Sequence, residues 1–264
     1  MLNVRSTVAL LFASIVVFAS THAPAVDRTQ FHRLSMVDVK FGSEERQAWI
    51  SAIGNDQTAK LGLMIAQYDI GMLLELTASN GKSALMVASK KGDLQLARTL
   101  VAAGASVHDE TQTNGTAFMF AVLGNQIAVA KWLVVEGAKI DVIGSNGWSA
   151  LTIAAAKGHD EILSWLIESG ADAQHRDVYR YTPFLRAVEN GQINAASILL
   201  ALPETDVNAQ DEYDNSSLHH AVSANHTELI SLLLNNGANP DVVNRDGLSA
   251  RVLAKSLGRP ISQP

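Results

Sequence analysis

Six hydroxyl residues recur along this 264-residue chain at a nearly constant spacing. The intervals between them are 33, 33, 33, 34 and 33 residues, and the residues are Ser83, Thr116, Ser149, Thr182, Ser216 and Ser249. A fixed period in this range indicates a repeat protein, in which each small unit buries its apolar face only against a neighbouring copy. The spacing therefore predicts an extended array of units.

The residues that follow each hydroxyl residue also recur. An Ala stands five residues later, and a Gly or Asn stands nine residues later, at Gly92, Asn125, Gly158, Gly191, Asn225 and Gly258. Ser and Thr cap a helix by accepting a backbone N–H, and Gly and Asn take the left-handed conformation that ends one. The pattern predicts a short first helix in every unit.

A second apolar run at helical spacing predicts a second helix in most units. The runs are Leu94–Leu100, Val129–Val134, Ile162–Ile167, Ile193–Leu200 and Leu229–Leu234. Twelve residues after the Gly or Asn stop, four units carry a Gly-Ala pair that ends this helix, at Gly104, Gly137, Gly170 and Gly237. Polar, turn-rich segments then lead to the next unit and predict hairpin-like loops.

Helix, turn, helix and loop within 33 residues resemble the ankyrin repeat, whose signature begins Thr-Pro-Leu-His-x-Ala. The best matches are Thr182–Ala187 and Ser217–Ala221, and the resemblance covers residues 58–258. It implies an all-α solenoid of about six stacked helix–turn–helix units joined by hairpin-like loops. Two departures are that only one hydroxyl residue is followed by Pro, and that Leu202-Pro203-Glu204 replaces one Gly-Ala pair.

The two ends of the array differ from its middle, as the terminal units of a solenoid must. Upstream, Ser43–Asn55 and Lys60–Leu76 are predicted helices, the second within a unit that has a shortened loop. Downstream, Ser249–Leu257 provides one helix before Gly258 stops the chain, so the last repeat is incomplete. We divide the chain into an N-terminal segment with a capping helix, residues 26–57, and a repeat array, residues 58–264.

Residues 1–25 have the three parts of a secretory signal peptide. Arg5 precedes an apolar stretch from Thr7 to Ala19, and Ala23-Pro24-Ala25 follows it. We expect cleavage after Ala25, because cleavage after Ala23 would leave Pro24 at the new N-terminus. The apolar stretch is shorter than the roughly twenty residues of a membrane-spanning helix, which disfavours an uncleaved anchor. We therefore expect a soluble periplasmic or secreted protein.

Charge and cysteine content narrow the classes of partner. The net charge is −6, and removal of residues 1–25 leaves 19 Lys and Arg against 26 Asp and Glu, a net charge of −7. An acidic array binds nucleic acid poorly, so we expect no nucleic-acid partner. The chain has no cysteine, which excludes disulfides and suits a bacterial periplasm better than an animal secretome. We expect a monomer without membrane contact.

The histidines in the fifth unit are candidate metal ligands, but their positions in the repeat also predict structural roles. His219 stands at the histidine position of the ankyrin signature, where the resemblance implies a structural hydrogen bond. His226 follows Asn225 as His159 follows Gly158, and recurring positions favour recurring structural roles.

A hydrolytic triad is disfavoured for a related reason. Ser216 and Ser217 lie at a helix cap, which argues against a triad of Ser217, Asp214 and His219. The sequence also has no nucleotide-binding glycine loop, dinucleotide fingerprint or calcium loop. We expect no enzyme activity, no cofactor and no metal.

Other large side chains also have packing explanations. Trp132 and Trp165 stand 33 residues apart in the second helices and are predicted to pack. Met86, Met119, Phe118 and Phe120 are predicted to form the interior of the first helices.

The residues at non-recurring positions of loop tips and first-helix edges form the predicted protein-binding surface. Tyr, Trp and Arg dominate the energetics of protein interfaces, and three of the four tyrosines of the mature chain lie at these tips. The predicted residues are Lys90, Lys91, Trp148, Tyr179, Arg180, Tyr181, Glu212 and Tyr213. The alternatives are that neighbouring tips pack on one another and that the lysines, with Lys157, are simply solvated.

Three functions follow from this sequence. The first is a non-enzymatic protein that binds another protein in the periplasm or outside the cell, as an inhibitor, an immunity factor or an accessory of an enzyme. The second is a secreted effector that binds a host protein. The third is a metal-dependent hydrolase that uses His219, His220 and Asp214.

Overall fold

The computed structural model describes residues 41–259 and 261. The predicted signal peptide and residues 26–40 lie outside this range, and the predicted division of the chain stays a prediction. All regular elements of the described residues are helices, accompanied by three isolated β-bridges. The predicted all-α fold is confirmed.

The described part begins with three helices that precede the regular units. They are α3 (Ser43–Gly54), α4 (Thr58–Ile65) and α5 (Ile70–Leu74). The helix predicted over Ser43–Asn55 is confirmed to within one residue. The prediction of one continuous helix over Lys60–Leu76 is wrong, because the Asp69 side chain accepts the Met72 N–H at 3.1 Å and starts a new helix after a turn.

The regular part consists of units 1 to 6, each made of a loop and the helices that follow it. The first helices of the units are α6 (Ala84–Lys91), α8 (Ala117–Leu123), α10 (Ala150–Lys157), α12 (Pro183–Glu189), α14 (Ser217–Ser223) and α16 (Ala250–Ser256). The second helices are α7 (Leu94–Ala102), α9 (Ile127–Val135), α11 (Asp160–Glu168), α13 (Ile193–Leu200) and α15 (Thr227–Asn235). Unit 6 has one helix in the described residues, as predicted.

The recurring polar residues define the ends of the helices. Five of the six hydroxyl residues accept the backbone N–H of the third residue after them, at 3.1–3.4 Å. The hydroxyl of Ser216 contacts the ring of His219 instead, at 2.8 Å. All six Gly and Asn stops have positive φ values, between 58° and 76°. The predicted stops are therefore confirmed at all six positions and the predicted caps at five.

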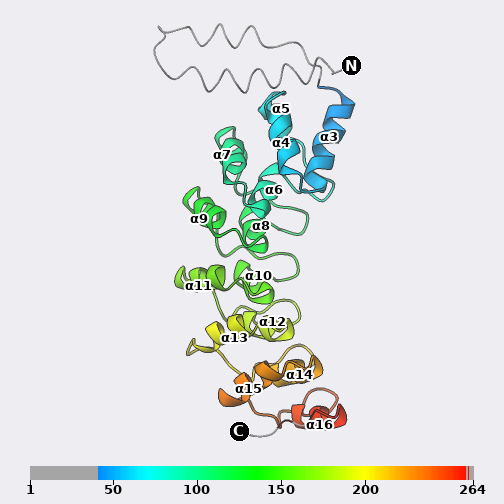
Figure 1. Cartoon of the computed structure of the whole chain (residues 1–264), viewed down its shortest axis with the longest axis vertical. Coiled ribbons are helices and arrows are strands. Elements are labelled where there is room, and N and C mark those ends of the chain that lie inside the picture. The colour runs from blue at the N-terminus through cyan, green and yellow to red at the C-terminus, as the bar shows by residue number, and fades with distance from the viewer. Residues whose placement is uncertain (1–40, 260, 262–264) are drawn as a thin grey trace, which may run out of the picture. The chain divides into compact units, whose positions relative to one another are not determined.

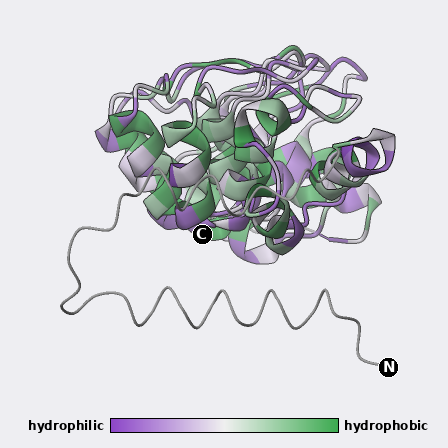
Figure 2. Ribbon diagram, turned by 90° about the horizontal axis from the view of Figure 1, so that it is seen from above, coloured by the Kyte–Doolittle hydropathy of each residue, from purple (hydrophilic) through white to green (hydrophobic). Residues whose placement is uncertain are grey.

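Successive units stack in two layers of helices. Figure 1 shows the first helices between the second helices on one side and the loops on the other. Each first helix contacts the first helix of the next unit. One buried apolar residue recurs two positions after the hydroxyl residue, at Leu85, Phe118, Leu151, Phe184 and Leu218. Seen along the stack, the hydrophobic residues gather between the two helix layers (Figure 2), so the core grows by addition of units.

The loops form a hydrogen-bonded row. Each five-residue loop is closed by a bond of 2.9–3.1 Å from its first N–H to its fifth carbonyl, and the loops are residues 78–82, 111–115, 144–148, 177–181, 211–215 and 244–248. Each loop after the first also donates a backbone N–H, at 3.0–3.4 Å, to a carbonyl of the preceding loop. This row fixes the loops side by side, which orders the side chains at their tips.

The helices described here are short. None of those within residues 41–259 combines the length and the apolar character that a membrane crossing requires.

Candidate protein-binding surface

The inner face is the surface made by the loops and by the exposed positions of the first helices. Its character changes along the stack at one slot, the fourth residue after each hydroxyl residue. This slot holds Val87, Phe120, Ile153, Arg186, His220 and Leu253 in units 1 to 6. It is apolar in units 1 to 3 and holds a basic or titratable residue in units 4 and 5.

Unit 4 pairs this slot with an acid at the start of its own loop. The Nε of Arg186 donates to Oδ2 of Asp177 at 2.7 Å, and its Nη2 donates to the same oxygen. Nη1 of Arg186 donates to Glu189 at 2.7 Å. The Asp177 side chain is fully buried, and its other oxygen accepts the backbone N–H groups of Tyr179 and Tyr181. The ion pair therefore holds the loop against the helix.

Three aromatic rings surround the guanidinium group of Arg186. The distances from its central carbon to the ring centroids are 3.8 Å for Tyr181, 5.3 Å for Trp148 and 5.9 Å for Tyr179. A cation within about 6 Å of an aromatic face is attracted by the ring quadrupole. Trp148 belongs to the loop of unit 3, so these contacts join two units.

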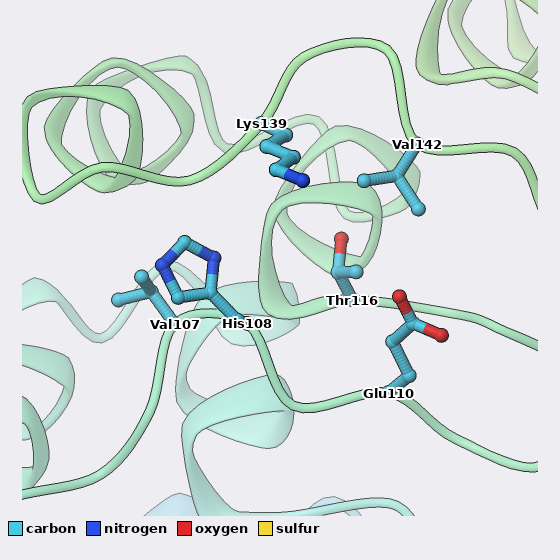
Figure 3. Close-up of a pocket in the computed structure, with 6 residues that line it drawn as sticks. All are labelled: Val107, His108, Glu110, Thr116, Lys139 and Val142. Carbon is cyan, nitrogen blue, oxygen red and sulfur yellow. The ribbon is translucent and has the colours of Figure 1, made fainter.

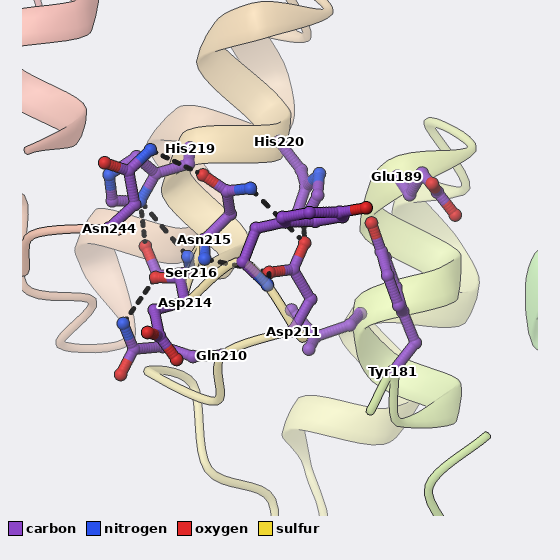
Figure 4. A network of polar contacts seen from close by, with 12 residues as sticks. Tyr181, Glu189, Gln210, Asp211, Asp214, Asn215, Ser216, His219, His220 and Asn244 are labelled. Atoms are coloured by element: carbon purple, nitrogen blue, oxygen red, sulfur yellow. Dashed lines mark hydrogen bonds and ion pairs between the residues drawn. The ribbon is translucent and has the colours of Figure 1, made fainter. Parts of the chain in front are cut away.

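Unit 5 has an equivalent pair, part of a wider polar network (Figure 4). Nε2 of His220 lies 3.0 Å from Oδ2 of the buried Asp211. Burial would raise the pKa of Asp211, but hydrogen bonds from the N–H groups of Asn215 and Tyr213 outweigh it and lower that pKa. Burial lowers the pKa of His220 despite the nearby carboxylates. Both shifts favour, at neutral pH, an ionised aspartate that accepts a hydrogen bond from a neutral imidazole.

Unit 3 leaves open the corner that unit 4 fills. A hollow of about 360 Å³ lies between the loops of units 2 and 3 and the first helices α8 and α10. Its apolar lining includes Phe120, Leu123, Trp148 and Ile153. Gly144 stands where Asp177 stands in unit 4, and Ile153 where Arg186 stands, so the side chains that close the corner in unit 4 are absent here. The hollow can accept one large apolar side chain.

Two other hollows recur and belong to the scaffold. One of about 280 Å³ is lined by Val107, His108, Glu110, Thr116, Lys139 and Val142 (Figure 3). A second hollow, of about 450 Å³, is lined in part by residues that stand 33 positions after lining residues of the first. Ile140 corresponds to Val107, and Ser149 corresponds to Thr116. Because these hollows lie at equivalent positions of neighbouring units, they result from the packing of the repeat and do not indicate a specific binding site.

The residues predicted to form the binding surface at the loop tips differ in their exposure. Tyr179 and Tyr213 are 49% and 58% exposed, as predicted for tips. Trp148 is half-buried between the hollow and Arg186. The prediction that Tyr181 projects from a tip is wrong, because it is only 8% exposed and packs with Leu185 and Ala209. Burial and the carboxylates of Glu189 and Asp211 raise the pKa of Tyr181, which keeps it neutral.

Arg180 is exposed and has an unusual backbone conformation. Its φ is +64°, in the left-handed region that suits glycine, and the same loop position holds Gly81, Gly147 and Gly247 in other units. Arg180 and Arg245 both lie 3.3 Å from the carboxylate of Asp214. A strained residue with a long exposed side chain is a candidate for a binding role.

The predicted charged residues have different environments. Lys90, predicted as a binding residue or as a simply solvated one, forms an ion pair that was not predicted: it lies 2.7 Å from Asp56, which Lys82 also contacts. The two lysines outweigh the effect of burial and lower the pKa of Asp56. Lys91 is exposed, and Glu212 is half-buried with its backbone N–H bonded to the Tyr179 carbonyl.

Sequence reasoning missed Arg186, Leu123 and the inner-face position of Phe120. Phe120 was predicted as interior but is only half-buried and lines the hollow. The signal was present in the sequence, because the slot of Phe120 and Arg186 changes character from unit to unit whereas core slots do not.

The residues considered for hydrolysis have separate partners. Nε2 of His219 donates to the Leu248 carbonyl at 3.0 Å, and its Nδ1 accepts from Ser216. The Ser217 hydroxyl donates to the Val207 carbonyl at 2.6 Å. Because Asp214 pairs with arginines, these side chains do not form a triad.

Metal-ligating side chains also fail to converge. Within residues 41–259, no group of three His, Cys, Asp or Glu side chains is arranged to hold a metal ion. The hydrolase alternative therefore has no supporting geometry.

Comparison with known proteins assigns the repeated units. A family model described as ankyrin repeats (3 copies) matches residues 47–143 and 118–211, and one described as ankyrin repeats (many copies) matches residues 204–254. The chain is also 41% identical over 76 residues to "Protein fem-1 homolog C" of Danio rerio. That match covers 26% of this chain and 12% of the relative, so it concerns the repeats and not the whole of that protein.

Proposed function

Because the chain belongs to the ankyrin-repeat family, whose arrays are protein–protein interaction modules, we propose that its inner face binds one partner protein in the periplasm or outside the cell. The partner is an enzyme or toxin, which this protein inhibits or stabilises. The chain itself performs no catalysis.

One observation carries this proposal: an apolar hollow, a half-buried Trp148 and two exposed tyrosines lie on the same face. Interfaces are anchored by aromatic residues that surround a desolvated centre. Tyr179 and Tyr213 keep about half of their surface exposed, and the backbone bonds between the loops hold them in place before a partner arrives.

Export supports the choice of compartment. Arg5, the apolar stretch Thr7–Ala19 and Ala23-Pro24-Ala25 form a signal peptide, and the absence of cysteine suits a protein that folds without disulfides. Mass spectrometry of the exported protein is expected to give an N-terminus at Val26. A cytoplasmic product that keeps residues 1–25 would contradict export.

Affinity capture from the exported fraction tests the binding function. We expect the wild-type chain to retain a specific protein that the Tyr179→Ala/Tyr213→Ala variant loses. The matched control is Leu63→Ala/Val135→Ala, which removes two apolar side chains from α4 and α9 that are more exposed than the two tyrosines. Equal capture by both double variants would exclude the tyrosine tips as the binding surface.

Activity of the captured partner separates the two roles. An inhibitor or immunity factor is expected to lower the partner's activity in a titration, whereas an accessory is expected to raise its activity or its thermal stability. A partner whose activity and stability are both unchanged would contradict both roles.

A further inference from the structure

We infer that the inner face accepts a partner segment that carries a large apolar side chain and, a few residues away, a Lys or Arg. This inference rests on the proposed function and specifies the chemistry of the partner. It follows from the contrast between unit 3 and unit 4.

The apolar part of the segment corresponds to the hollow of unit 3. Its walls are the side chains of Phe120, Leu123, Trp148 and Ile153, and its volume is about 360 Å³. Gly144 is buried at its edge, and a Cβ placed there would lie 3.1 Å from Oδ1 of Asn146, 3.5 Å from the Thr113 carbonyl oxygen and 3.6 Å from the Met119 side chain. At this edge the hollow is bordered by a glycine, at the position where Thr111, Asp177 and Asp211 have side chains in other units.

We expect the basic residue of the partner segment to be attracted by an excess of negative charge next to the hollow. Arg186 binds two carboxylates, those of Asp177 and Glu189, and a third carboxylate, that of Asp211, binds His220 in the next unit. His220 contacts Asp211 from within a mostly buried site and stays neutral. Glu189 is the most exposed of the three acids, with about a third of its side chain accessible. A partner cation at Glu189 would offset part of this negative charge.

The two parts are adjacent, and Trp148 joins them. Its ring lines the hollow and also lies 5.3 Å from the Arg186 guanidinium group. Neighbouring helices pack about 8–10 Å apart, and an extended chain advances about 3.3 Å per residue. The apolar and basic side chains of the partner segment should therefore stand about three residues apart in sequence.

Selection of short random peptides displayed on phage against the full folded chain tests the inference. We expect enriched peptides to combine Leu, Phe, Met or Trp with a Lys or Arg at that spacing. The charge variant Leu123→Glu in the hollow should weaken their binding roughly tenfold or more. The matched control, Val135→Glu on α9, should leave binding unchanged, since Val135 is 83% exposed and lies outside the hollow.

A second pair of variants tests the charge. Glu189→Gln should weaken the binding of the selected peptides roughly twofold to fivefold, and this loss of affinity should be smaller at high salt. Glu168→Gln, which removes the same charge from the exposed end of α11, should have no effect. When the basic residue of the peptide is replaced by Gln, the peptide should bind wild type and Glu189→Gln with equal affinity.

The outcomes distinguish this inference from the function on which it rests. Peptides that need Leu123 but are acidic or uncharged would overturn the inference and leave the proposed function intact. Peptides that bind Leu123→Glu as well as wild type would overturn the inference, whereas the proposed function would fall only if the capture experiment also failed. A wild-type dimer that Leu123→Glu dissociates would also overturn the inference, since a second copy would then be the occupant. A selection that yields no binder would contradict a linear segment while leaving a folded partner for the capture experiment.

Discussion

The carboxylate of Asp177 binds the guanidinium group of Arg186 nine residues later, and the same spacing separates Asp211 from His220. In unit 3 the two positions hold Gly144 and Ile153, and the hollow opens there. Between units 3 and 4, this pair therefore distinguishes a corner closed by an ion pair from one that is open to a partner.

Exchange of the unit 4 pair for the unit 3 pair tests this relationship. Arg186→Ile alone should lower the free energy of unfolding by about 3 kcal/mol, because it leaves the buried Asp177 carboxylate without its cation. The Asp177→Gly/Arg186→Ile variant should be more stable than Arg186→Ile, since it removes the stranded charge. Urea titration measures both values, and a double variant less stable than the single one would contradict the relationship.

The close approach of neighbouring loops predicts a difference between two glycines. A Cβ at Gly147 would lie 2.7 Å from the Val178 nitrogen, whereas a Cβ at Gly247 would meet no atom within 4 Å. Both have positive φ, so Gly247→Ala should cost about 1–2 kcal/mol through backbone strain alone. Gly147→Ala should lower the free energy of unfolding by about 1–3 kcal/mol more than Gly247→Ala does, because the new methyl group would overlap the next loop. Equal losses in thermal or urea unfolding would mean that loop packing contributes nothing.

The left-handed conformation of Arg180 predicts a stabilising substitution. Arg180→Gly should raise the free energy of unfolding by about 1 kcal/mol, because glycine relieves the strain and the lost ion pair with Asp214 is exposed. Asn114→Gly, at the same loop position in unit 2, should gain less, since Asn tolerates positive φ. A stabilised Arg180→Gly protein that binds its partner more weakly would show that the strain is retained for binding. A destabilised one would show that Arg180 is structural.

The Asp211–His220 pair predicts loss of stability in acid. The folded-state pKa of His220 is below its ordinary value of 6.5, so the unfolded chain binds more protons and stability falls as the pH drops through 6.5. The lowered pKa of Asp211 acts in the same direction below its ordinary value of 3.8. Glu189, Tyr181, His219 and Asp211 contribute to the charge or packing around the ring.

A matched variant isolates the contribution of His220. His220→Gln keeps a donor for Asp211 and does not titrate, so its free energy of unfolding should change less between pH 7 and pH 5 than that of the wild type. Urea titrations at the two pH values provide the comparison. An unchanged pH dependence would show that His220 keeps its ordinary pKa in the folded protein.

The repeated elements were predictable because their causes are local. A hydroxyl residue at a helix start and a Gly or Asn nine residues later act through backbone bonds within one unit, and all six stops have the expected conformation. The break at Asp69 was missed because the apolar run continues across it, and only the bond from the Met72 N–H to the Asp69 side chain reveals the new helix.

The candidate site was less predictable because its residues interact across units. The burial of Tyr181 depends on Arg186 in its own unit and on His220 in the next one. The pairing of Lys90 with Asp56 joins residues 34 positions apart. Tyr179 and Tyr213, whose exposure needs only a position at a loop tip, were placed correctly.

Photo-crosslinking from the inner face in living cells tests most directly whether this surface holds a partner protein. A benzophenone amino acid would replace Leu123, which is 36% exposed in the hollow, or Val135, which is 83% exposed on α9. Non-specific crosslinking would favour the more exposed position 135. We expect one discrete protein adduct from position 123 and none from position 135. Adducts of equal yield and pattern from both positions, or an adduct from position 135 alone, would contradict binding through the inner face.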